Sequence, residues 1–143
     1  MGDISRNFSF SEFEHSDIAI REGIDNSIPS PEVRANIGAL ARNVLQPLRD
    51  DLKAPVIVKS GYRCKQLNQL VGGVETSQHC KGEAGDIRSP FHTPLHIARR
   101  IVALKLPFDQ LILYPTFVHV SHKRKGKQRG QVLYNRRYTG DKI

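Results

Sequence analysis

The residues best suited to chemistry lie between positions 60 and 87, where side chains with metal-binding atoms are interspersed with glycines. His79 and Asp86 are separated by a short stretch that contains Gly82 and Gly85. A flexible loop of this kind can direct both side chains to one point, which a single helix could not do. Imidazole nitrogen and carboxylate oxygen both bind zinc at about 2.0–2.2 Å, and a catalytic zinc site has three protein ligands and leaves the fourth position to water. The pair therefore predicts a zinc site that needs one more ligand.

The third ligand has to come from outside this stretch, and four further histidines are candidates: His92, His96, His119 and His122. In a strand over residues 117–121, side chains alternate between the two faces, so His119 points away from the valines on either side of it. With those valines in the core, His119 lies on the open face of the sheet. His122 either points with the valines or lies beyond the strand, and the other two lie near a helix start. A single histidine on a strand is more often structural than a metal ligand. The presence of the His79 and Asp86 pair, however, favours His119 as the third ligand.

The spacing of apolar residues predicts the elements that must hold these side chains. A serine-proline pair, typical of a helix start, is followed by apolar residues at helical spacing. This pattern predicts a long core helix over residues 31–48, which Pro47 could kink. A β-branched run over residues 54–60 predicts a strand that delivers Arg63 to its end. Further helices are expected near residues 8–13, 67–71 and 93–104, and further strands from residue 86 and at 111–114, 117–121 and 131–134.

Helices and strands mix without a repeating βαβ order, so we expect an α+β fold. It would consist of a small antiparallel sheet with helices packed on one face and the zinc site on the open face. The 143 residues fit one domain, 1–143, without an internal repeat or a linker. No apolar run approaches the roughly 18–20 residues of a membrane span. Cys64 and Cys80 are expected to be free, partly buried thiols, in preference to a disulfide, and Cys80 is a weaker candidate for zinc ligation.

The net charge of +8 is unevenly distributed along the chain. Residues 122–143 contain eight of the 22 Lys and Arg residues and only one of the 14 Asp and Glu residues. This basic C-terminal segment therefore carries +7, and the rest of the chain is close to neutral. A solvated surface and an anionic partner both fit this pattern.

Four motifs follow one another along the chain, and their combination in this order is a more specific sign of family resemblance than any single motif. They are Ser60-Gly61-Tyr62-Arg63, then Ser77-x-His79-x-x-Gly82-x-Ala84-x-Asp86, then Phe108-Asp109-Gln110-Leu111-Ile112, and finally Val118-His119-Val120-Ser121. From about residue 8 to residue 121, the chain resembles peptidase family M15, the zinc D-Ala-D-Ala carboxypeptidase family, in its short phage and prophage form. The resemblance implies a hedgehog- and DD-peptidase-like fold, zinc as the cofactor, and His79, Asp86 and His119 as its ligands. It also implies that Arg63 contacts the substrate or its transition state.

Two residues of these motifs could act on a bound peptide. Arg63 can form a bidentate pair with a terminal carboxylate or neutralise a developing oxyanion, and an ordinary salt bridge is the alternative. Ser77 could hydrogen-bond the substrate or shape the turn before the first ligand. Active relatives commonly place a carboxylate or a second histidine shortly before the last ligand, whereas residues 113–118 contain neither. As general base we therefore expect Asp109, the nearest acid in sequence, in slight preference to Glu83.

The resemblance implies zinc-dependent hydrolysis of peptide bonds in bacterial peptidoglycan, by a lysin-like D,D-carboxypeptidase or stem-peptide endopeptidase. The start of the chain lacks the pattern of a secretory signal, so we expect synthesis in the cytoplasm and action at the cell wall after release, or from a virion. The basic segment could bind anionic wall polymers. The alternative is a non-catalytic module in which zinc and Arg63 bind a peptidoglycan peptide. Nucleic-acid binding is disfavoured, because the segment offers only Tyr134 and Tyr138 for stacking.

Overall fold

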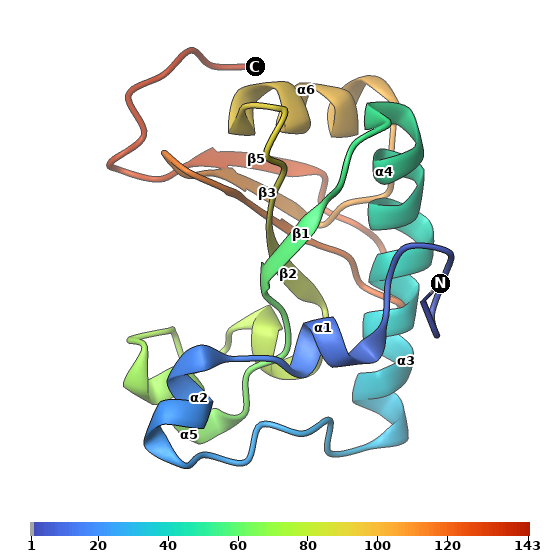
Figure 1. Ribbon diagram of the computed structural model, residues 1–143. Coiled ribbons are helices and arrows are strands. Elements are labelled where there is room, and N and C mark those ends of the chain that lie inside the picture. The colour runs from blue at the N-terminus through green and yellow to red at the C-terminus, as the bar shows by residue number, and fades with distance from the viewer. Residues whose placement is uncertain (1) are drawn as a thin grey trace.

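The fold is built around one five-stranded sheet, seen in a computed structural model that describes residues 2–143 (Figure 1). The strands lie in the order β1-β2-β4-β3-β5. Their bounds are β1 Ile57–Ser60, β2 Ala84–Arg88, β3 Gln110–Leu113, β4 Val118–Ser121 and β5 Gln131–Tyr134. The first four are antiparallel neighbours, whereas β5 pairs with β3 in parallel.

The α+β prediction is confirmed, but the sheet is mixed where a purely antiparallel one was expected. The reason lies in the strand order. Strand β4 already has β2 and β3 on its two edges, so the free edges are those of β1 and β3, and β5 pairs with the outer edge of β3. The connection over residues 122–130 reverses the chain after β4, and β5 therefore runs in the same direction as β3. The strand predicted at 131–134 is thus present as an edge strand.

Most of the helices agree with the sequence pattern, although a 3-10 turn over residues 78–81 begins the stretch that was expected to be a loop. They are α1 Phe10–Glu14, α2 Asp17–Glu22, α3 Pro31–Leu40, the π-helical turn η1 Ala41–Leu45, α4 Gln46–Leu52, α5 Lys65–Leu70, the 3-10 turn η2 Gln78–Lys81, and α6 Pro94–Ala103. The predicted long helix is α3, η1 and α4 in line, and the π turn precedes Pro47, which has no N–H to give to a regular helix. Helix α2 was not predicted, although Ser16 caps it and Gly23 ends it.

The core lies between the sheet and the helices α3, α4 and α6. Alternate residues of the central strands are fully buried there: Ile87, Leu111, Leu113, Val118 and Val120. They pack in one cluster with apolar residues of the long helix and of α6. Figure 1 shows α3 and α4 in line along one side of the molecule, with α6 near the end of α4. The residues between the buried ones, including Asp86 and His119, face the other side of the sheet, which we call the open face.

The N-terminal helices fix the segment that follows β1. Buried Asn26 donates to the carbonyl oxygens of Glu14 and Tyr62, each at 2.9 Å, and accepts from the Cys64 N–H at 2.7 Å. Tyr62 N–H donates to the carbonyl of Phe13 at 2.7 Å. Arg63, which lies between the residues held by Asn26, is thereby held at the edge of the open face.

Two smaller expectations concern thiols and membranes. Cys64 and Cys80 are free thiols and partly buried, as predicted, and the Cys64 sulfur accepts from the Leu67 N–H at the start of α5. Within residues 2–143, none of the helices combines the length and apolar character needed to cross a membrane.

Candidate metal centre

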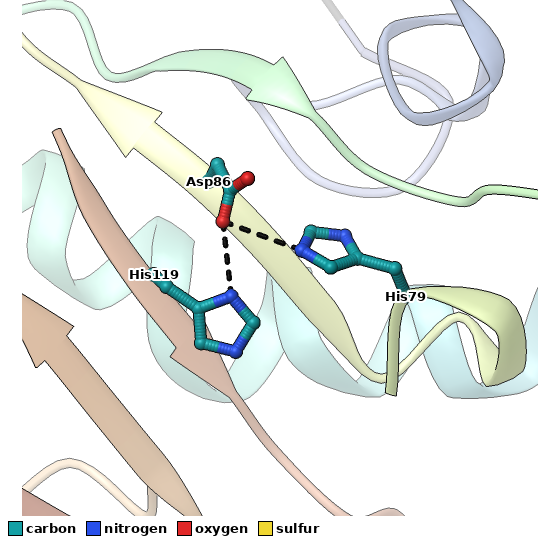
Figure 2. A group of neighbouring side chains, drawn as sticks. All are labelled: His79, Asp86 and His119. Carbon is teal, nitrogen blue, oxygen red and sulfur yellow. Dashed lines mark hydrogen bonds and ion pairs between the residues drawn. The ribbon is translucent and has the colours of Figure 1, made fainter. Parts of the chain in front are cut away.

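Three side chains from three separate elements meet on the open face. One ligand atom each of His79, Asp86 and His119 lies within 4.8 Å of the others. Asp86 on β2 and His119 on β4 are direct partners in the antiparallel pairing, and His79 comes from η2, which precedes β2. Figure 2 shows the two histidine rings converging on the Asp86 carboxylate. The structure thus brings together the three residues that the sequence predicted as ligands.

His79 is oriented for coordination by a contact behind it. Its Nδ1 lies 2.7 Å from the carbonyl oxygen of Gly61, which makes Nδ1 the protonated, donating nitrogen. Its Nε2 is buried and makes no hydrogen bond, although Asp86 Oδ1 is 3.3 Å away. A buried polar atom without a partner is rare, and a metal-bound histidine characteristically donates its other N–H to such a carbonyl. The unpartnered Nε2 is therefore suited to bind a metal ion.

Asp86 completes a donor set that suits zinc. Its Oδ1 lies 2.9 Å from His119 Nδ1. Burial alone would raise the pKa of Asp86, but the hydrogen bond from His119 and the close approach of the His79 imidazole outweigh it and hold the pKa far below its ordinary range. The carboxylate is therefore ionised at neutral pH, as a ligand must be. Two imidazoles and one carboxylate could hold zinc with one coordination position left for another molecule.

A cavity of about 530 Å³ lies over the three side chains. Its walls come from residues 72–74 and 76–78, the open face of β3, and two arginines, Arg63 and Arg129. The volume is within the range of about 300–1,000 Å³ that is usual for small-ligand sites. The candidate metal centre therefore lies in a space that can admit part of a peptide.

Arg63 and Ser77, both predicted from sequence, line this cavity. The Arg63 Nε is buried and has no hydrogen-bond partner, and its backbone N–H donates to the carbonyl of His79 at 3.1 Å. A Cβ at Gly73 would overlap Asn68 Oδ1 and would also lie 3.1 Å from Arg63 Nη1. The Ser77 hydroxyl accepts from the His79 N–H at 3.2 Å and so caps η2. Arg63 keeps a free donor for a ligand, and Ser77 shapes the turn.

Asp109 does not line the cavity and is fully buried. It accepts from the Arg129 guanidinium, with Nη2 to Oδ2 at 2.6 Å, from the Arg129 backbone N–H at 2.8 Å and from Gln78 Nε2 at 3.2 Å. The side-chain hydrogen bonds from Arg129 are the main cause that lowers the pKa of Asp109 to about 2. Such a carboxylate is a poor proton acceptor near neutral pH, so its contacts favour a structural role over that of general base. Glu83, the second choice, bonds Gln78 at 3.3 Å and also does not line the cavity.

Two cavity residues were missed by the sequence analysis. Tyr114 follows Gln110 and Ile112 on the open face of β3, and its ring stacks on Phe117 with centroids 4.3 Å apart. The alternation that placed His119 could have placed Tyr114, had it been applied to this strand as well. Burial, and to a lesser degree the charge of Asp86, raises the pKa of Tyr114, so its hydroxyl keeps its proton at neutral pH. Arg129 lies outside the predicted helices and strands, and the sequence analysis counted it only as part of the positive charge of the basic segment.

Comparison with known proteins is consistent with this geometry. A family model described as Peptidase M15 matches residues 6–121, which include the three converging side chains, Arg63 and Tyr114. Arg129 lies outside the matched region. No curated protein matches the chain.

We expect the three side chains to bind one zinc ion with unit stoichiometry. Replacing His79, Asp86 or His119 by alanine should weaken zinc binding by about 100-fold or more, since loss of outer contacts alone commonly costs about 10–100-fold. Calorimetric titration of the metal-free protein measures this. His15→Ala is the matched control, because His15 is 61% exposed and pairs with Asp17. Unchanged zinc affinity in Asp86→Ala would contradict the site.

The ion pair between Asp109 and Arg129 should make stability depend on pH in acid. The folded pKa of about 2 lies below the ordinary value of 3.8, so the stabilisation is present above about pH 4 and is lost as the pH falls through 2. Asp109→Asn should therefore be about 2 kcal/mol less stable than the wild type at pH 7, with the difference shrinking between pH 4 and 2. Urea unfolding across this range tests it. A difference independent of pH would show that the pair does not cause the shift.

Proposed function

The chain belongs to peptidase family M15 and is thereby a metallopeptidase by kind, and we propose that it uses zinc to hydrolyse peptide bonds of bacterial peptidoglycan. One observation carries the proposal. The unpartnered Nε2 of His79 and the unpartnered Nε of Arg63 belong to the same cavity. A metal centre beside a buried, free cationic donor suits a peptide bond that lies close to a carboxylate.

In this proposal His79, Asp86 and His119 hold the zinc ion. When bound, zinc activates water for attack on a carbonyl and polarises that carbonyl. Arg63 offers its guanidinium to the substrate carboxylate beside the scissile bond, or to the oxygen on which charge develops. The Gly61 carbonyl keeps His79 in the tautomer that leaves Nε2 unprotonated. The cavity walls restrict the orientation of the peptide.

Tyr114 is the proposed proton donor to the leaving amine. It lines the cavity from β3, and its raised pKa keeps the phenol protonated at neutral pH. Among residues 2–143, neither a carboxylate nor a histidine beyond the three candidate ligands lines the cavity, so the proton of the attacking water passes to solvent, and Tyr114 regains its own proton from solvent. Loss of a positioned base commonly costs about 10²–10⁴-fold in rate. Slow hydrolysis is therefore expected.

The same observation favours a second candidate function, a zinc-containing module that binds peptidoglycan peptides without cleaving them. Arg63 and the metal centre would hold the peptide carboxylate, and no proton acceptor would be needed. The two functions differ in the fate of the bound peptide. Whether the enzyme would be a D,D-carboxypeptidase or a stem-peptide endopeptidase depends on which side of the scissile bond extends out of the cavity.

The basic segment presents several exposed cationic side chains. Lys125, Lys127, Arg136 and Arg137 are exposed. We propose that they concentrate the protein on anionic wall polymers, after release or from a virion, through contacts that salt weakens. Co-sedimentation with cell walls at low and high salt, with these four side chains replaced by glutamine, tests this. Binding that persists at high salt or in the variant would reject it.

Turnover of stem peptides decides between the two functions. The zinc-loaded protein should release a product from a D-Ala-D-Ala peptide or from digested peptidoglycan, detectable by mass spectrometry, and His79→Ala should abolish it. Arg63→Gln should lower kcat/KM by about 10²–10³-fold, as loss of an oxyanion donor does. Binding of the peptide by the zinc-loaded protein without any product would establish the module and reject the peptidase.

Tyr114→Phe should lower kcat by about 10-fold or more while leaving zinc affinity unchanged, because only the donating hydroxyl is lost. Tyr138→Phe is the matched control, since the Tyr138 hydroxyl bonds the carbonyl of Asp141 and not the cavity. Equal kcat values for Tyr114→Phe and the wild type would remove the phenol from proton transfer.

A further inference from the structure

Arg129 brings a second guanidinium to the cavity, from the part of the chain that lies outside the family match. Its Nε and Nη2 donate to the Asp109 carboxylate at 3.1 and 2.6 Å. Its Nη1 makes no hydrogen bond in the described part of the chain, and 49% of the side chain is exposed. One edge of the guanidinium is thus anchored, and the other is available.

The anchor of this guanidinium is buried and hydrogen-bonded to the sheet. Asp109 is fully buried, and its backbone N–H donates to the carbonyl of Ser121 at 2.7 Å. Gln131 and Gly130, which follow Arg129, donate to the carbonyls of Asp109 and Phe108 at 3.0 and 3.2 Å. The arginine is therefore held at the point where β5 joins the sheet. A side chain fixed in advance loses less entropy on binding a ligand.

The strand order places the two arginines of the cavity on opposite sides of the metal centre. Arg63 follows β1, which is one edge of the sheet, and Arg129 precedes β5, which is the other. Asp86 and His119 lie on β2 and β4 between these edges. Asp86, a candidate ligand, is the one acid among the cavity-lining residues that the structure describes. The cavity thus offers a cationic group on each side of the candidate metal centre.

We propose that Arg129 binds a second carboxylate of the substrate, carried by a residue on the acyl side of the scissile bond, while Arg63 binds the carboxylate on the other side. The preferred substrate is then a peptide with an acidic group on each side of the bond that is cut. This inference rests on the proposed function and makes Arg129 a specificity-determining residue. A guanidinium that served only to secure the loop over residues 122–130 would not distinguish acidic from neutral peptides.

The test uses two synthetic stem peptides that differ in one group, an acyl-side carboxylate in one and a carboxamide in the other. Calorimetry with the metal-free protein measures binding separately from turnover. The wild type should bind the acidic peptide about 10-fold more tightly, as for a charge-assisted hydrogen bond. Arg129→Gln should reduce this ratio to about 1, and Arg129→Lys should retain part of it. Arg21→Gln, at an arginine 71% exposed on α2, should retain it fully.

Two binding results would overturn the proposal. Equal affinity of the wild type for the two peptides overturns the proposal, even if Arg129→Gln fails to fold. A ratio that survives in folded Arg129→Gln also overturns it. Hydrolysis of the same peptides by the zinc-loaded protein is measured separately. A binding preference that depends on Arg129, without any hydrolysis, would reject the peptidase while leaving the acidic-peptide site intact.

Discussion

The pairing of β2 with β4 is the constraint on which the site depends. It sets Asp86 directly opposite His119, so that carboxylate and imidazole meet on one face of the sheet. The same register sends Ile87, Val118 and Val120 into the core. A shift by one residue would exchange the two faces, burying the polar groups and exposing the apolar ones. Burial of the apolar face of the sheet therefore maintains the geometry of the site on its open face.

The third side chain depends on a different kind of support. His79 lies on a 3-10 turn, and its orientation follows from the hydrogen bond to Gly61 at the end of β1. That segment is in turn held by Phe13 of α1 and by Asn26 in the loop after α2. Elements distant in the chain thus act together on one imidazole. The orphaned Nε2 indicates that this support leaves an atom free for a ligand.

An ion pair between exposed Arg129 and buried Asp109 links the basic segment to the same site. A buried carboxylate is costly unless it is paired and hydrogen-bonded, and Asp109 satisfies both needs through Arg129 and Gln78. Gln78 neighbours His79, so the contact that anchors the C-terminal part of the chain also touches the turn with the first candidate ligand. The charge pattern of this segment suggests a solvated tail, but its Arg129 forms part of the cavity wall.

The sequence by itself determined the α+β class, most helices and strands, and the three converging side chains, because periodicity and a short ordered motif depend on near neighbours. Strand alternation was enough to turn His119 away from the valines. The tertiary structure decided the parallel pairing of β5, the burial of Asp109 and the entry of Arg129 into the cavity. These depend on which strand edge is free and which charges meet, and such contacts join residues far apart in the chain. Local sequence patterns carry no record of them.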